Sequence, residues 1–467
     1  MGFAKFASLK RVRIIDSCLK ERKMTRVILS FDTEDYINPI GVESIVRTSR
    51  LLRKYGIRGC YNVVAKLAEA LVKWERQDAI EELRHHEIET HSYKHSMHPT
   101  INEYTDIEDF ERAKSLFLEE EVKAVAIIKE ILGTDEIVAA CPPGSSVSYV
   151  AHYGYADMGI KTYDGDLLID AKRSRPIFYA NVAALNYDKM LDKFLIESSH
   201  EDIDALLERI ADKKDVFVLY HHPQKAYVSQ HPDIVNCIMP DNESEWKLSE
   251  RIPEESTEKF FENFEYLIQK LLADNRFKIT TFKEIEEEYC NDKRYITMKE
   301  IPEIKRQLEE YFFPVTTPDS YCITDVLFAA RDLLLGKEKH ECGYVYGFLN
   351  TPYGITEKVT LTKDDVITSA YQIKDYFLPE KIYVRDFAIG PRDWLFAALK
   401  VLTGEESFEI LPGDFQIDMD QFPKMRDLNL RKMWIDLESF EDKYLSERGR
   451  LQSWTYRLPK NTDRKIF

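Results

Sequence analysis

The chain has 467 residues, of which 44% are hydrophobic and 31% are charged, a mixture typical of folded globular domains. Because one domain rarely exceeds about 250 residues, we expect two. The formal net charge of −17 provides no basic face for nucleic acid or an anionic membrane, so we expect neither as a partner. No run of about 18 apolar residues occurs, which predicts that no transmembrane helix is present.

The cysteines and the N-terminal segment both bear on the compartment. Seven cysteines, an odd number without a Cys-x-x-Cys pair, argue against a disulfide framework and favour a reducing environment. Residues 1–24 are basic but lack the continuous apolar stretch of a secretory signal. We therefore expect a cytoplasmic protein in which residues 1–24 form an N-terminal extension.

The first part of the chain alternates strand and helix patterns, beginning with an apolar strand at 26–31 and an amphipathic helix at 42–54. Further strands are predicted at 61–65, 138–140, 161–163, 216–220 and 278–282, and further helices at 78–84, 107–132, 200–213 and 259–272. This alternation predicts an α/β fold with a mainly parallel sheet, open or closed into a barrel. Ligands of such folds bind beyond the carboxyl ends of the strands.

After residue 290 the pattern becomes helical. Helices are predicted at 323–335, 365–378 and 391–402. Thr362 and Asp365 form a start similar to a capping box for the second of these helices. We therefore predict a second, smaller, mainly α-helical domain over residues 291–467, whose role the pattern does not indicate.

Three carboxylates, Asp32, Glu34 and Asp35, follow the first predicted strand. Carboxylates crowded at the end of a strand repel one another and resist burial, and a divalent cation would remove that cost. The alternative interpretation is a solvated loop or a helix cap.

Histidines supply the other candidate groups. His91 and His95 are four residues apart, so on a helix they would point the same way, as metal-binding pairs do, and His98 would share that face. The alternative is a polar helix face. His221 and His222 end an apolar strand, the position expected of a general acid, although a histidine there can also be structural.

The order and spacing of these elements resemble the polysaccharide deacetylases, the NodB-homology or carbohydrate esterase family four domain. The similar segments are Ser-Phe-Asp-Thr-Glu-Asp at 30–35, Tyr-Gly-Ile-Arg-Gly-Cys-Tyr-Asn-Val at 55–63, His-Glu-Ile-Glu-Thr-His-Ser-Tyr-Lys-His at 86–95, Cys-Pro-Pro-Gly at 141–144 and Tyr-His-His-Pro at 220–223. The segment at 86–95 is the most specific match, although His85 and Glu89 replace glycines of the family pattern. The resemblance implies a distorted (β/α) barrel of about seven strands over residues 25–290.

The resemblance also implies roles for the metal-binding residues. His91 and His95 would bind a divalent metal, with zinc as the expected ion. Glu34 would be the third protein ligand, with Asp35 as the alternative, because the extra residue in this motif leaves the alignment ambiguous.

The remaining roles concern proton transfer. Asp32 would be the general base, and His222 the general acid, with His221 as the alternative. Asp164 and Asp166 would be partners of the acid or, equally, turn residues.

One departure from the family pattern affects the base. Cys141 stands where the family has an arginine that pairs with the catalytic carboxylate, and the aromatic residue before Gly144 is also missing. Arg58 or Lys161 could replace the arginine. The missing aromatic residue leaves the sugar-stacking surface of the family without a counterpart.

Together these features favour a metal-dependent hydrolase of non-peptide carbon–nitrogen bonds that deacetylates an N-acetylated sugar or polysaccharide. The lack of a signal sequence favours, as an alternative, a cytosolic amidohydrolase acting on a small N-acyl compound. The missing arginine favours a third hypothesis, a degraded barrel that binds carbohydrate without turnover.

The C-terminal region has a fainter resemblance to pseudomurein-binding repeats, which are small helical wall-binding modules. The similar segments lie at 365–376, 379–384 and 391–395. The alternative is a helical domain that packs on the barrel rim, as a lid or as the surface of a homo-oligomer, with Trp394 in its core.

Overall fold

A computed structural model describes most of the chain. The described residues are 24–143, 148–165, 168–169, 176–211, 215–232, 236, 243–291, 293–417, 424–425, 439–462 and 464. The predicted N-terminal extension, Gly144 and Asp166 therefore lie outside the described residues, apart from Met24.

A curled, mainly parallel sheet forms the first part of the molecule. Its central strand β1 (Thr25–Thr33) pairs in parallel with β2 (Cys60–Val63), β10 (Val216–His221) and β11 (Phe277–Thr280). Beyond β2 the parallel order continues through β3 (Glu87–Thr90), β4 (Ala139–Ala140), β5 (Thr162–Asp164) and β8 (Val182–Leu185). The predicted α/β class with a parallel-rich sheet is confirmed.

Short strands extend this sheet at both ends. β9 (Lys189–Met190) pairs in parallel with β10, whereas β7 (Ile177–Tyr179) pairs antiparallel with β8. The described residues thus form an 11-stranded sheet where about seven strands were predicted. The strands that were not predicted include β3, β7, β8 and β9, which are only two to four residues long, too short to leave a periodic signal in the sequence.

β1 shows how the sheet separates two environments. Val27, Leu29 and Phe31 pack into the large core cluster, whereas Ile28 packs into a separate cluster with Cys60 and Val218. Successive side chains of a strand point to opposite faces, so Ser30 and Asp32 share the face of Ile28. Asp32 therefore lies on the inner face of the curled sheet.

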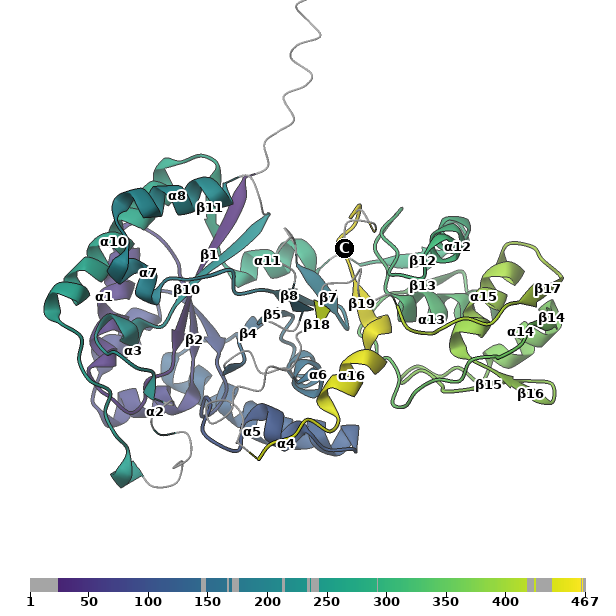
Figure 1. Ribbon diagram of the computed structural model, residues 1–467, viewed down its shortest axis with the longest axis horizontal. Coiled ribbons are helices and arrows are strands. Elements are labelled where there is room, and N and C mark those ends of the chain that lie inside the picture. Colours follow the sequence, from purple (N-terminus) through teal and green to yellow (C-terminus); the bar gives the residue numbers. More distant parts are fainter. Residues whose placement is uncertain are drawn as a thin grey trace, which may run out of the picture.

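Helices cover the outer face of the sheet (Figure 1). They are α1 (Gly41–Lys54), α2 (Ala65–Lys73), α3 (Gln77–Leu83), α4 (Ile101–Thr105), α5 (Phe110–Leu132), α6 (Tyr149–Asp157), α7 (Asp192–Glu197), α8 (His200–Ile210) and α10 (Glu254–Ala273). In contrast, α11 (Phe282–Tyr289) packs Phe282 and Ile285 into the inner cluster of Ile28. The predicted helices at 42–54, 78–84, 107–132, 200–213 and 259–272 correspond to α1, α3, α5, α8 and α10.

The second part of the chain combines helices with two-stranded antiparallel sheets (Figure 1, right). Its helices are α12 (Ile301–Glu310), α13 (Ile323–Leu334), α14 (Lys363–Ala370) and α15 (Pro391–Leu402). Its strand pairs are β12 (Tyr295–Thr297) with β13 (Lys339–Glu341), β14 (Val359–Thr362) with β17 (Ser407–Ile410), and β15 (Ile382–Val384) with β16 (Phe387–Ile389).

The helix predicted at 365–378 ends early. Its capping box of Thr362 and Asp365 is present, but α14 stops at Ala370. Beyond the helix, the Gln372 side chain forms two hydrogen bonds with the backbone of Tyr383 in β15. Trp394 is fully buried and donates to Ser369, as expected of a core residue.

The C-terminal segment returns to the first sheet. After α16 (Leu445–Leu451), β19 (Tyr456–Arg457) pairs antiparallel with β7, and Figure 1 shows both elements between the two parts. The boundary near residue 290 stays a prediction, as does the resemblance to pseudomurein-binding repeats. Within the residues that the structure describes, every helix is too short or too polar to cross a membrane.

Candidate metal centre and catalytic cluster

The candidate site lies where three parallel strands end. Glu34 directly follows β1, His91 directly follows β3 and His222 directly follows β10. The pairing register places Phe31 of β1 beside His221 of β10, so the ends of these two strands are level. Parallel strands leave their carboxyl ends at one edge of the sheet, which brings the three motifs together.

His91 and His95 do not lie on a helix, the geometry for which their four-residue spacing was considered. Both residues lie in a loop after β3, where Ser92 and His95 adopt left-handed backbone with φ of 69° and 55°. The Ser92 hydroxyl accepts a hydrogen bond from the His95 backbone N–H at 3.1 Å. This tight turn places the two imidazole centroids 4.8 Å apart without helical spacing.

His98 does not share this site. Its Nδ1 lies 2.8 Å from the Glu103 carboxylate, at the start of α4. The expectation of a common face with His91 and His95 required a helix and is therefore wrong.

Glu34, His91 and His95 form a buried cluster. His95 Nε2 lies 2.8 Å and His91 Nε2 3.5 Å from Glu34 Oε2. The opposite ring nitrogens are held by other groups, since His91 Nδ1 lies 2.5 Å from the Cys141 carbonyl oxygen and His95 Nδ1 lies 2.9 Å from Ser96 Oγ. Both Nε2 atoms are thereby turned toward Glu34.

This cluster fits a divalent metal ion. His91 Nε2 is buried without a hydrogen-bond partner, a costly arrangement for a polar atom, and Glu34 Oε2 is buried against the two imidazoles. Two imidazole nitrogens and one carboxylate oxygen form a donor set that suits zinc and related transition metals.

The other oxygen of Glu34 is held by two residues that the sequence analysis missed. Gln224 donates from Nε2 to Glu34 Oε1 at 2.8 Å, and His231 Nδ1 lies 2.8 Å from the same atom. Burial raises the pKa of Glu34, but His95, His222 and the hydrogen bond with His231 outweigh it and hold the pKa well below its usual range. Glu34 is therefore an anion that presents Oε2 to the imidazoles.

The Asp35 carboxylate, unlike that of Glu34, is bound by backbone N–H groups of its own loop. Its Oδ1 accepts hydrogen bonds from the backbone N–H groups of Ile37 and Asn38 at 3.1 and 2.8 Å. These contacts make Asp35 a turn residue at the start of α1 and favour Glu34 as the carboxylate of the cluster.

Asp32 lies beside this cluster and is held by neutral donors. Asn62 donates from Nδ2 to Asp32 Oδ1 at 2.7 Å, and the Tyr187 hydroxyl donates to the same atom at 3.2 Å. The Cys141 thiol is 3.6 Å away, in the place expected for an arginine. Arg58 is exposed and Lys161 pairs with Glu286, so neither replaces the arginine as suggested from the sequence.

His222 faces Asp32 and is oriented by Asp192. His222 Nε2 lies 3.6 Å from Asp32 Oδ2, and Nδ1 lies 2.8 Å from Asp192 Oδ2. Burial lowers the pKa of His222, but the carboxylates of Asp192, Glu34 and Asp32 outweigh it and raise the pKa to about 10. His222 is therefore a cation at neutral pH and can donate a proton.

The alternative acid, His221, points away from the site. Its ring packs against Phe31, Phe260 and Phe264, and burial lowers its pKa to about 4. A neutral ring among phenylalanines cannot serve as the acid, so this alternative is wrong. The reason is the two-residue alternation of β10, which turns His221 outward and His222 inward.

The partner of His222 is also corrected. Asp192, the first residue of α7, holds the imidazole in place of Asp164. Asp164 is buried at the end of β5, and Asp166 lies outside the described residues. No motif near Asp192 indicates this role, because its approach to His222 depends on the tertiary fold.

The chain was compared with known proteins. No family model and no curated protein matches it. Among solved structures it is similar to one assigned as a polysaccharide deacetylase from Mycobacterium smegmatis, at 13% identity and a TM-score of 0.38, over 58% of this chain and 91% of that one.

Two further structures are similar. A carbohydrate esterase family 4 pseudoenzyme from Bacillus anthracis has 12% identity and a TM-score of 0.32, over 56% of this chain and 66% of that one. A family 4 acetyl xylan esterase from Clostridium thermocellum, solved with a cobalt ion, has 14% identity and a TM-score of 0.32, over 56% of this chain and 91% of that one. These structures belong to the family that the sequence motifs resemble.

Proposed function

We propose that the protein is a metal-dependent hydrolase that removes the acetyl group from an N-acetylated sugar. One observation carries this proposal: the buried cluster of Glu34, His91 and His95 lies beside a carboxylate, Asp32, and a protonated imidazole, His222. A base and an acid beside a Lewis-acid site are the groups that hydrolysis of an amide requires.

The metal would be held by Glu34 Oε2 and by Nε2 of His91 and His95. When bound, it would polarise the amide carbonyl and make water more acidic. Zinc suits this donor set, and three protein ligands leave room for water and substrate.

Asp32 acts as the base in this proposal. Asn62 and Tyr187 occupy its Oδ1 and leave Oδ2 to take the proton from the attacking water.

His222 acts as the acid. An amine is a poor leaving group as an anion, so the nitrogen must receive a proton as the bond breaks. Asp192 binds Nδ1, which leaves the Nε2 proton directed at the reacting centre near Asp32.

The test combines metal analysis with activity. We expect the purified chain to retain about one equivalent of divalent metal and to release acetate from oligomers of N-acetylglucosamine. His91→Ala should lose both properties, whereas His200→Ala, which changes an exposed histidine on α8, should keep both.

A metal-free and inactive wild-type chain would contradict the proposal. A chain that binds metal and sugar without turnover would instead support a carbohydrate-binding role, which the cysteine in place of the arginine favours.

A further inference from the structure

The chain that follows β10 reaches the candidate site at two points. His222, which directly follows this strand, lies 3.6 Å from Asp32 Oδ2 through its Nε2. Farther along the same segment, His231 Nδ1 lies 2.8 Å from Glu34 Oε1. Residues 222–231 therefore supply both the proposed acid and an imidazole that binds the proposed metal ligand.

Backbone contacts fix the path of this segment. It continues from His222 into the short helix η2 (Pro223–Ala226), and Val228 then forms an antiparallel bridge with Arg251. The Ser229 N–H donates to the Glu250 carbonyl at 2.9 Å. These contacts hold the chain just before His231 and so restrict where its imidazole can lie.

The His231 imidazole is mostly buried and donates to the Glu34 carboxylate. The side chain of His231 is 14% exposed and that of Glu34 is 1% exposed. Because Glu34 is an anion and can only accept, the proton of this hydrogen bond lies on His231 Nδ1. Gln224 donates to the same oxygen at 2.8 Å, which leaves Oε2 to face the imidazoles of His91 and His95.

The same imidazole contacts the proposed acid. The ring centroids of His231 and His222 are 4.4 Å apart and the ring planes meet at 82°, an edge-to-face arrangement that is favourable for aromatic pairs. Asp192 binds His222 through Nδ1, at one end of the ring. The ring of His231 adds a packing contact that restrains the rest of the His222 side chain.

A second metal ion is the alternative use of these groups. One ligand atom from each of Glu34, His222 and His231 lies within 4.8 Å of the other two. However, Glu34 Oε1 already accepts a hydrogen bond from Gln224, and a metal on His222 would replace the proton that the acid must donate. A positioning role for His231 keeps all of the contacts that the structure shows.

We propose that His231 is a positioning residue that aligns the metal ligand Glu34 and the acid His222 with each other. Its Nδ1–H directs the Glu34 carboxylate toward the two ligand imidazoles, and its ring restrains His222. This inference rests on the proposed function for the roles of Glu34 and His222.

Two substitutions separate the two contacts of His231. His231→Asn keeps an N–H donor close to the position of Nδ1 but removes the ring, whereas His231→Phe keeps a ring but removes the N–H. His231→Ala removes both. The side chain of His231 is partly exposed, so each replacement has room at this position.

Zinc affinity tests the contact with Glu34 and needs no turnover. The full-length chain is stripped of metal and titrated with zinc in competition with a chromophoric chelator. We expect His231→Phe and His231→Ala to bind zinc about 10- to 100-fold more weakly than the wild type, the usual loss when a residue that holds a metal ligand is removed. His231→Asn should bind zinc about as tightly as the wild type.

Acetate release from oligomers of N-acetylglucosamine at saturating zinc tests the contact with His222. The kcat of His231→Asn and His231→Ala should fall about three- to tenfold with little change in KM, the size expected for loss of one ring contact. His231→Phe should keep a kcat near that of the wild type once zinc saturates it.

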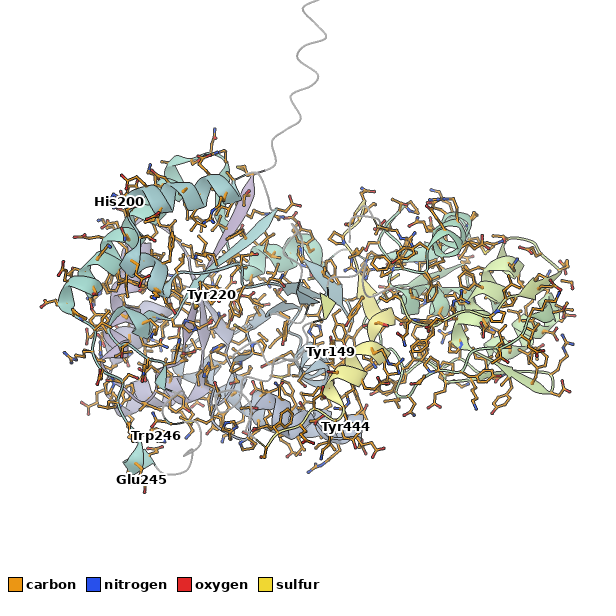
Figure 2. The ribbon with its side chains drawn as sticks, viewed as in Figure 1. Tyr149, His200, Tyr220, Glu245, Trp246 and Tyr444 are labelled. Carbon is orange, nitrogen blue, oxygen red and sulfur yellow. The ribbon has the colours of Figure 1, made fainter. Side chains whose placement is uncertain are left out.

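His200→Ala is the control for both measurements and should match the wild type in zinc affinity and kcat. His200 is exposed, and Figure 2 shows it at the upper left edge of the first part, away from Tyr220 near the end of β10.

Wild-type zinc affinity in His231→Phe would overturn the inference, as would equal kcat values of His231→Asn and His231→Phe at saturating zinc. A second equivalent of zinc that is lost in His231→Ala would also overturn it, because His231 would then be a ligand. Failure of the proposed function has a different signature: the wild-type chain then releases no acetate, while the order of zinc affinities among the variants persists.

Discussion

Asp32 and its neighbours show how one carboxylate can be oriented by neutral hydrogen-bond donors. Asn62 and Tyr187 both donate to Oδ1, and the cysteine at position 141 contributes only a thiol. Hydrogen bonds to a charged group contribute about 1.5–3 kcal/mol each, so two of them can fix the carboxylate.

We predict that Asn62→Ala lowers kcat about 10- to 100-fold with little change in KM, because the base loses its orientation while substrate contacts remain. Metal content should stay at the wild-type level. Tyr61→Phe is the matched control, since that neighbouring hydroxyl is buried without a hydrogen-bond partner. An unchanged kcat in Asn62→Ala, measured by acetate release, would exclude this role of Asn62.

A second prediction concerns Asp192→Asn. The Asp192 carboxylate is the largest of the influences that raise the pKa of His222, so its loss should lower that pKa. The acid must be protonated to act, and the alkaline limit of kcat should therefore move to lower pH. The pH dependence of acetate release measures this limit, and an unshifted alkaline limb would contradict the assignment.

Helices and strands with regular spacing could be predicted, whereas turns and long-range contacts could not. α1, α5 and α15 follow the apolar periodicity of the sequence closely. The turn at His95 could not be predicted, because four-residue spacing does not reveal that Ser92 and His95 take left-handed backbone.

In the candidate site, too, some residues could be predicted from sequence motifs and others could not. The motifs identified Asp32, Glu34, His91, His95 and His222, and the fold brings these residues together. Gln224, His231 and Asp192 were missed, because each reaches the site through tertiary contacts that leave no local pattern.

The packing of α6 against α5 gives a prediction for whole elements. A Cβ at Gly154 would lie 2.2 Å from the Phe117 ring, a distance that forces the helices apart. We expect Gly154→Ala to lower the free energy of unfolding by about 1–3 kcal/mol, measured by denaturant titration. Gly343→Ala adds a Cβ in open space and should have little effect. Equal stability of the two variants would show that α5 and α6 adjust freely.

Buried neutral histidines link the stability of the whole molecule to pH. Burial lowers the pKa of His86 to about 4 and that of His152 to about 3, below the ordinary value of 6.5. As pH falls, the histidines of the unfolded chain take up protons before those of the folded chain do. The contribution of the two neutral histidines to the free energy of unfolding is therefore complete above pH 6.5 and is lost as pH falls toward 4 for His86 and toward 3 for His152. Each pH unit in this range costs about 1.4 kcal/mol per histidine.

We therefore predict that the free energy of unfolding of the wild-type protein falls between pH 7 and pH 5. His152→Gln should make this pH dependence less steep. The same variant should also be less stable at pH 7, because it loses the hydrogen bond to the Tyr179 carbonyl. His200→Gln, at an exposed position, should keep the wild-type slope. Denaturant titrations at several pH values measure the free energy of unfolding of the wild type and of both variants. The same slope of this free energy against pH in all three proteins would contradict the prediction.

The pairing of β19 with β7 has a consequence for how the chain folds during synthesis. Residues 177–179 emerge from the ribosome long before residues 456–457, which complete that side of the sheet. Until then the edge of β7 opposite β8 has no strand beside it, and its backbone groups can pair with another nascent chain. Slow translation or truncation before residue 456 should therefore promote aggregation through this edge, even though the proposed metal centre lies on strands made much earlier.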